Sequence, residues 1–158
     1  MRRGTILPLA LLALLFSASA CSVRYERSPA PVTASTSGYG MICNDPALRG
    51  EVVGDVPGSI TGCGIENAVR VHEVNGIRLS TGAVVDCPTA KAFKTWVGKG
   101  MVPAVGRQGG GVETIRIAAS YACRTRNHQR GARISEHGRG KAIDVSGYTL
   151  RDGTEVTL

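Results

Sequence analysis

The sequence contains few aromatic residues, and its cysteines lack the spacing of a zinc finger. Aromatic side chains make up 4% of the 158 residues, which leaves few platforms on which nucleic-acid bases could stack. None of the five cysteines belongs to a C-x-x-C pair, so a cysteine-based zinc finger is not expected. The apolar run of residues 6–16 is shorter than the roughly 20 residues that a membrane-spanning helix needs.

Residues 1–20 have the layout of a secretory signal peptide. A pair of arginines precedes the apolar run, and small residues follow it, as in other export signals. Cys21 comes next, as in the lipobox of a bacterial lipoprotein, although Ala18 stands where leucine is usual. We therefore expect an exported protein, periplasmic or anchored in the cell envelope through a lipid on Cys21, with plain secretion as the alternative.

Residues 21–40 have the composition of a flexible tether, because residues 28–40 are rich in Pro, Ser, Thr and Gly and cannot bury a core. The folded domain is then expected over residues 41–158. The chain has a formal net charge of +7. An exported basic protein is attracted to anionic surfaces, so we expect peptidoglycan or another envelope polymer as a partner, the membrane through the N-terminal lipid, and no nucleic acid.

Four cysteines remain if Cys21 is acylated. They are disulfide candidates, because disulfides form and persist in exported proteins. Their spacing alone leaves three connectivities open. The four are Cys43, Cys63, Cys87 and Cys123.

Turn signals predict two hairpins. The Asn-Gly pair at 75–76 suits a tight turn between the β-branched strands of residues 69–79. The Asp-Gly pair at 152–153 predicts a second hairpin over residues 148–158. Each pair offers the positive φ angles that a two-residue hairpin turn requires.

Hydrophobic periodicity predicts one main helix and one central strand. Residues 88–105 have apolar side chains at helical spacing, and Asp86 or Cys87 can cap the helix. Residues 114–122 alternate as a central strand does. Residues 41–63 are rich in Gly and Pro, which predicts loops with one short strand. The expected fold class is α+β, with an antiparallel sheet of hairpins and one main helix.

The stretch SEHGRGKAID, residues 135–144, carries the clearest chemical signal. His137 and Asp144 supply an imidazole and a carboxylate, and zinc binds both groups in proteins. The glycines between them permit the chain reversal that would bring both side chains to one ion. We therefore select this pair as candidate metal ligands.

A basic loop precedes this stretch, over residues 124–133. Arg124 follows the predicted central strand directly, and for this reason we expect it to belong to the site. The other cations of the loop are expected to face solvent: Arg126, Arg130, Arg133 and His128.

The stretch matches S-x-H-x-x-G-x-A-x-D and resembles the signature of zinc D-alanyl-D-alanine carboxypeptidases and dipeptidases that act on peptidoglycan peptides. The segment from Cys43 to the end of the chain resembles the bacterial extensin-like protein C-terminal family more closely. The resemblance covers nearly the whole folded region. The other matching segments are CNDPALRGEV, GCGIENAVRV, LSTGAVVDCPTA and SYACRTRN.

This resemblance implies a D-Ala-D-Ala-carboxypeptidase-like fold and a zinc peptidase. His137 and Asp144 match two zinc ligands, and zinc-activated water would hydrolyse peptidoglycan peptides. Arg124 matches the arginine that binds substrate or stabilises the developing oxyanion. Ser135 would contact the substrate or orient a ligand.

The pattern of the peptidases also includes a third ligand histidine and an acidic general base after the second hairpin. The sequence ends at Leu158, so we expect a C-terminally truncated domain with an incomplete site. The extensin-like pattern has a further cysteine beyond this point, which leaves open that one of the four lacks a partner. The alternative function is a non-catalytic lipoprotein that binds the cell wall or has a structural role in it.

Overall fold

The structure is a computed structural model that describes residues 38–158. The predicted signal peptide, the lipidation of Cys21 and nearly all of the predicted tether lie outside the described residues. Within the described range, no helix is both long and apolar enough to cross a membrane.

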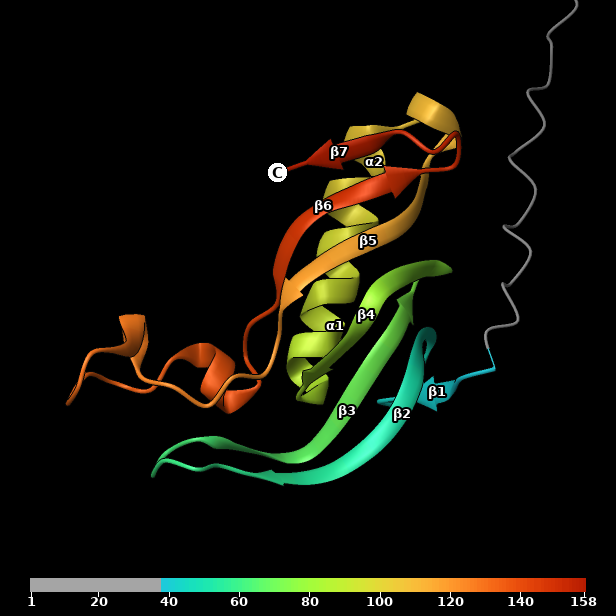
Figure 1. The fold of residues 1–158 in the computed structure, drawn as a ribbon. Helices are drawn as coiled ribbons and strands as arrows, with labels where there is room; N and C mark the ends of the chain where they lie inside the picture. The colour runs from blue at the N-terminus through green and yellow to red at the C-terminus, as the bar shows by residue number, and fades with distance from the viewer. Residues whose placement is uncertain (1–37) are drawn as a thin grey trace, which may run out of the picture. The chain divides into compact units, whose positions relative to one another are not determined.

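Seven strands of the described residues form one sheet, and they lie side by side in chain order (Figure 1). All neighbouring pairs are antiparallel except β4 and β5, which run parallel. The strands are β1 Gly40–Ile42, β2 Asp45–Pro57, β3 Gly64–Val74, β4 Ile77–Val85, β5 Val112–Ala119, β6 Asp144–Leu150 and β7 Glu155–Thr157.

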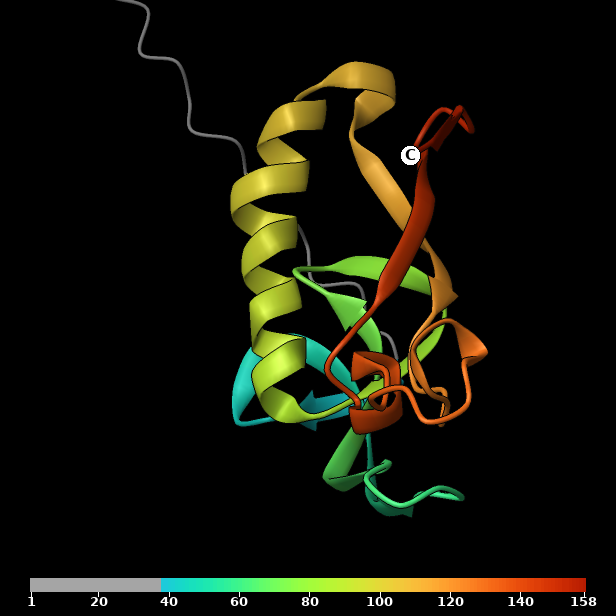
Figure 2. The same ribbon diagram turned by 90° about the vertical axis from the view of Figure 1, so that its left-hand side faces the viewer.

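A helical segment of 19 residues connects β4 to β5 and packs along one face of the sheet (Figure 2). It consists of α1 Cys87–Trp96, a π-helical turn Val97–Met101 and α2 Val102–Val105. Parallel neighbours need such a crossover, because a tight turn can join only antiparallel strands. The helical crossover therefore allows β4 and β5 to run parallel, and this pair makes the sheet mixed.

The expected fold class is wrong. We predicted an α+β fold with an antiparallel sheet, similar to that of D-Ala-D-Ala carboxypeptidases. The chain instead folds as a mostly β protein with a seven-stranded mixed sheet and one helix of 19 residues, and no carboxypeptidase-like fold is shown. The prediction recognised the hairpins and the helix but did not use the helix as a crossover between parallel neighbours.

The helix begins where the sequence indicates. The side chain of Asp86 accepts a hydrogen bond of 2.8 Å from the backbone N–H of Thr89, which satisfies one of the free donors at the helix start. Pro88 lies in the first turn, where its missing N–H costs nothing. Gly98 and Gly100 fall in the π-helical turn, where the helix is locally wider than an α-helix.

Both predicted hairpins are confirmed. Asn75 and Gly76 have φ angles of 52° and 78° and connect β3 to β4. The turn containing Asp152 and Gly153 connects β6 to β7.

The prediction of loops over residues 41–63 is wrong, because β2 occupies much of this range. Its glycines are bulges and close contacts within a strand. A Cβ atom at Gly50 would lie 2.0 Å from the carbonyl oxygen of Arg70 on β3, and Gly54 has a φ of +83° at an irregularity of the ladder. Only glycine fits the first position, and it is favoured at the second.

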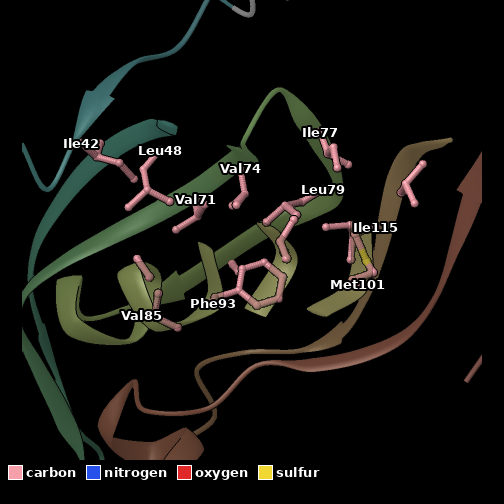
Figure 3. Packing of buried hydrophobic residues seen from close by; sticks show 14 of the residues in the cluster. Ile42, Leu48, Val71, Val74, Ile77, Leu79, Val85, Phe93, Met101 and Ile115 are labelled. Atoms are coloured by element: carbon pink, nitrogen blue, oxygen red, sulfur yellow. The ribbon is translucent and has the colours of Figure 1, made fainter. Parts of the chain in front are cut away.

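The core lies between the sheet and the helix. Figure 3 shows Leu48 and Val71 from the first strands, Ile115 from β5 and Phe93 from α1 meeting in one cluster. Leu48, Val71 and Ile115 are each fully buried. Burying a side chain of this size contributes about 1.5–3 kcal/mol, so these contacts hold the helix against the sheet.

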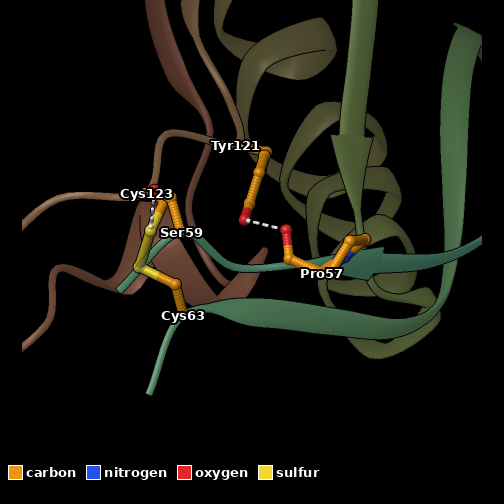
Figure 4. The surroundings of a disulfide bond; sticks show 5 residues. All are labelled: Pro57, Ser59, Cys63, Tyr121 and Cys123. Atoms are coloured by element: carbon orange, nitrogen blue, oxygen red, sulfur yellow. Dashed lines mark hydrogen bonds between the residues drawn. A yellow bond between two sulfur atoms is a disulfide. The ribbon is translucent and has the colours of Figure 1, made fainter. Parts of the chain in front are cut away.

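All four candidate cysteines are paired, so the structure selects one of the three connectivities. Cys43 is bonded to Cys87, and Cys63 to Cys123. No cysteine between residues 38 and 158 is therefore left without a partner. The second disulfide fastens the end of the β2–β3 hairpin to the segment that leaves β5, and Ser59 and Tyr121 lie beside it (Figure 4).

Candidate metal site

The antiparallel pairing of β5 with β6 determines where the candidate site forms, because the chain leaves β5 and enters β6 at the same end of the pair. Ala119 at the end of β5 is the Cα partner of Asp144 at the start of β6. The segment between them projects from the sheet (Figure 1) and ends in a short 3-10 turn, Glu136–Arg139. This turn brings the imidazole of His137 back to the end of β5.

His137 is held in one orientation by the backbone immediately after β5. Its side chain is buried, and its Nδ1 atom lies 2.6 Å from the carbonyl oxygen of Ser120. A carbonyl can only accept a hydrogen bond, so Nδ1 carries the proton and donates it. In the neutral ring, Nε2 then presents its lone pair. Histidines that bind metals are commonly oriented in this way by a backbone carbonyl.

The lone pair of Nε2 points towards Asp144. The distance from His137 Nε2 to Asp144 Oδ2 is 3.3 Å, and the two side chains are 10% and 56% exposed. With a neutral ring, both atoms are electron-pair donors, and either a proton or a metal cation between them satisfies both. Two ligands of a tetrahedral zinc ion, at bond lengths of about 2.0–2.2 Å, lie about 3.4 Å apart. The observed spacing therefore fits the donors of one zinc ion.

Close packing explains why glycine occupies positions 138 and 140 of the signature. Gly138 donates its backbone N–H to the carbonyl oxygen of Ser135 at 2.9 Å, and a Cβ atom on it would lie 3.0 Å from Cys63 Sγ. Gly140 has a φ of +67°, and a Cβ atom there would lie 2.4 Å from Ile65. The turn that carries His137 is thus packed directly against the Cys63–Cys123 disulfide and β3.

Ser135 and Arg124 are neighbours that are joined by a backbone hydrogen bond. The N–H of Ser135 donates to the carbonyl oxygen of Arg124 at 3.0 Å, and Ser135 is buried immediately before the turn that carries His137. In the described part of the chain, no hydrogen bond or ion pair joins the Arg124 guanidinium to His137 or Asp144. The structure therefore brings His137 and Asp144 together and leaves the roles of Arg124 and Ser135 as predictions.

The other cations of the basic loop face solvent, as expected. Arg126, Arg130, Arg133 and His128 are all exposed. Arg126 contacts Glu136 at 3.3 Å, and both side chains are about half exposed, so this ion pair contributes little to stability.

Ser120 was missed by the sequence analysis, although it orients the histidine. Its carbonyl oxygen accepts from His137, and its hydroxyl accepts a hydrogen bond of 3.1 Å from the backbone N–H of Val84 on β4. No sequence signal marks a backbone carbonyl as a histidine partner. Between residues 38 and 158, no group of three or more His, Cys, Asp or Glu side chains is placed to hold a metal ion.

Comparison with known proteins identifies one family. Residues 49–158 match a family model described as the extensin-like protein C-terminus. The match covers more than half of the chain and includes the whole candidate site. No curated protein and no solved structure gives a match.

Proposed function

Because the chain belongs to the extensin-like protein C-terminus family, we propose that it is a cell-envelope protein related to zinc D,D-peptidases and acts on peptidoglycan peptides. In this proposal His137 and Asp144 hold zinc. The observation that carries it is the 3.3 Å distance between His137 Nε2 and Asp144 Oδ2. The Ser120 carbonyl supports it, because it fixes the ring with Nε2 towards the carboxylate.

The residues of the site have distinct roles in this proposal. Bound zinc supplies Lewis-acid chemistry, which polarises a carbonyl group and lowers the pKa of water. His137 is a pre-oriented ligand, because its Nδ1 proton is occupied by the Ser120 carbonyl. Asp144 is half exposed and leaves the site open to a ligand from solvent.

Arg124 and Ser135 bind the substrate in the proposal. An arginine guanidinium offers two parallel donors to a carboxylate or to a developing oxyanion. Arg124 is half-buried and lies next to Ser135, so both are near the turn that presents His137. The export of the protein and its anchoring through Cys21 are also proposals.

Zinc titration of the purified chain tests the metal site. Because the site offers two protein ligands, we expect calorimetry to show weak binding of one zinc ion per chain, and we expect the variants His137→Ala and Asp144→Asn to lose this binding. The matched control is His72→Ala, because His72 also lies near a carboxylate, with Nε2 at 3.5 Å from Glu51. Binding of zinc that survives both site variants but is lost with His72 would contradict the assignment.

Digestion of muropeptides tests the reaction. The chain, loaded with zinc, is incubated with purified muropeptides, and the products are identified by mass spectrometry. Loss of a terminal D-alanine or cleavage of a peptide cross-link supports the proposal, provided that Asp144→Asn abolishes it.

A non-catalytic role in binding the cell wall is the second candidate. It is favoured by the exposed cations Arg126, Arg130 and Arg133 on the loop beside the site, since attraction to an anionic polymer requires no metal. Salt-sensitive sedimentation of the chain with cell-wall sacculi, without any released peptide, is the result expected for this role.

A further inference from the structure

A pocket of about 400 Å³ lies beside the β3–β4 pair and shares no residue with the candidate metal site. Its volume is within the range of about 300–1,000 Å³ in which proteins bind small molecules. The lining residues are mostly polar. Those that carry the argument are Tyr39, His72, Glu73, Arg78 and Gly82.

Glu73 is a carboxylate in an unusual environment. The residue is only 4% exposed, and its Oε2 atom is buried without a hydrogen-bond partner among the described residues. An unpaired buried charge is unfavourable, so a buried carboxylate is normally matched by a cation or by several donors. Glu73 lines the pocket, and a ligand there can supply that match.

The arginines nearest to Glu73 across the sheet do not pair with it. Arg49 on β2 and Arg78 on β4 are its Cα partners, yet neither forms an ion pair with Glu73 in the described structure. Arg78 instead contacts Glu113 at 2.9 Å, and these two side chains are 60% and 45% exposed. Exposed pairs of this kind contribute little, so the Arg78 guanidinium is available to a stronger partner.

An aromatic wall completes the pocket. The rings of Tyr39 and His72 stack with centroids 3.9 Å apart and planes inclined by 5°. Gly82 lets the side chains of Arg70 and His72 lie directly against the backbone of β4, because a Cβ atom there would lie 2.6 Å from Arg70 and 2.7 Å from His72 Cε1. Aromatic rings favour an adjacent ammonium group, which complements the carboxylate of Glu73.

From these groups we infer that the pocket binds the head group of an α-amino acid, with the ammonium on Glu73 and the carboxylate on Arg78. A divalent metal ion is a poorer match, because it requires several oxygen ligands and Arg78 would repel it. A simple amine lacks a group for Arg78. The zwitterion satisfies both charges at once, and the inference does not depend on the proposed peptidase function.

Norleucine and its two halves test the inference by NMR titration of the full chain. Hexanoate has the chain length and the carboxylate but no amine, and pentylamine has the ammonium but no carboxylate. We expect D- or L-norleucine to bind at least about tenfold more tightly than either half, because only norleucine forms charge-assisted hydrogen bonds with both Glu73 and Arg78. Norleucine that binds no better than hexanoate and pentylamine overturns the inference.

Three variants identify the groups that bind. Glu73→Gln should weaken norleucine binding at least about tenfold, and Arg78→Gln should reduce it to the level of pentylamine. Glu113→Gln removes only the surface partner of Arg78 and should leave the affinity at least as high. Arg78 is exposed, so its variant folds even if Glu73→Gln does not. Unchanged binding by Arg78→Gln, or a loss with Glu113→Gln, contradicts the assignment.

Discussion

Removal of the Cys63–Cys123 disulfide is expected to open the candidate site, whereas removal of Cys43–Cys87 is not. The two bonds join residues 60 and 44 positions apart. Loop-closure entropy predicts about 4 kcal/mol of stabilisation from each, with a difference of only about 0.3 kcal/mol. The double serine variants should therefore lose similar amounts of global stability, which makes one a matched control for the other.

The local consequence differs because only one disulfide touches the turn that carries the histidine. A Cβ atom on Gly138 would lie 3.0 Å from Cys63 Sγ, and the N–H of Ala122, next to Cys123, donates to the carbonyl oxygen of His137. Without the sulfur bridge, the β2–β3 hairpin end and this turn lose their covalent connection. We expect the turn to open more often than the sheet unfolds.

Hydrogen exchange measures this opening directly. In the Cys63→Ser, Cys123→Ser variant, the amides of Gly138 and Ala122 should lose more protection than the amides in β3 and β4. In the Cys43→Ser, Cys87→Ser variant, protection should fall by the same factor throughout, as expected when only global unfolding becomes easier. Urea denaturation gives the global loss for both. Equal protection of Gly138 in the two variants would refute the reasoning.

Three further predictions concern stability. Gly140→Ala should lower the free energy of unfolding by more than the roughly 1–3 kcal/mol that a positive φ alone costs, because a clash adds to the strain. In the control Gly153→Ala, φ is +85° but nothing lies within 4 Å, so this variant should lose only about 1 kcal/mol. The urea midpoints of the two variants compare these losses. Asp86→Ala should cost about 1 kcal/mol through loss of the helix cap, seen as a lower melting temperature, and an unchanged value contradicts the assigned cap. The hydrogen bond from Lys94 lowers the pKa of Asp45 below its ordinary value of 3.8, so the stability that Asp45 contributes is present at neutral pH and is lost as the pH falls below that value. In Asp45→Asn, the free energy of unfolding should therefore fall less steeply with decreasing pH in the acid range. An identical acid dependence in the two proteins would contradict this.

The parts of the fold that depend on neighbouring residues could be predicted from the sequence. The Asn75-Gly76 turn requires positive φ angles that these residues adopt easily, and Asp86 caps the helix through a bond to a residue three positions away. Such interactions are the same in almost any tertiary context. The hairpins and the helix therefore follow from short stretches of chain.

The parts that depend on distant residues could not be predicted. The parallel pairing of β4 with β5 joins Arg78 to Thr114 across the helical crossover, and no local pattern specifies it. Gly50 resembled a loop residue because the backbone of Arg70 that crowds it lies on another strand. Both errors arise because pairing partners decide the structure of a strand.

The candidate site likewise contains residues that could be predicted from the sequence and residues that could not. His137 and Asp144 could be selected from their chemistry and from the family resemblance, and the structure places them 3.3 Å apart. The Ser120 carbonyl that orients the ring could not be selected, because every residue has a carbonyl. The pocket at Glu73 was also missed, since burial of its carboxylate becomes visible only in the folded sheet.

Anomalous diffraction at the zinc absorption edge, from crystals of the chain grown with zinc, tests the central claim most directly. The account predicts a peak between His137 Nε2 and Asp144 Oδ2, at about 2.0–2.2 Å from each atom, with Nδ1 still bonded to the Ser120 carbonyl. A zinc peak bound elsewhere on the chain, with no density between these two atoms, would contradict it.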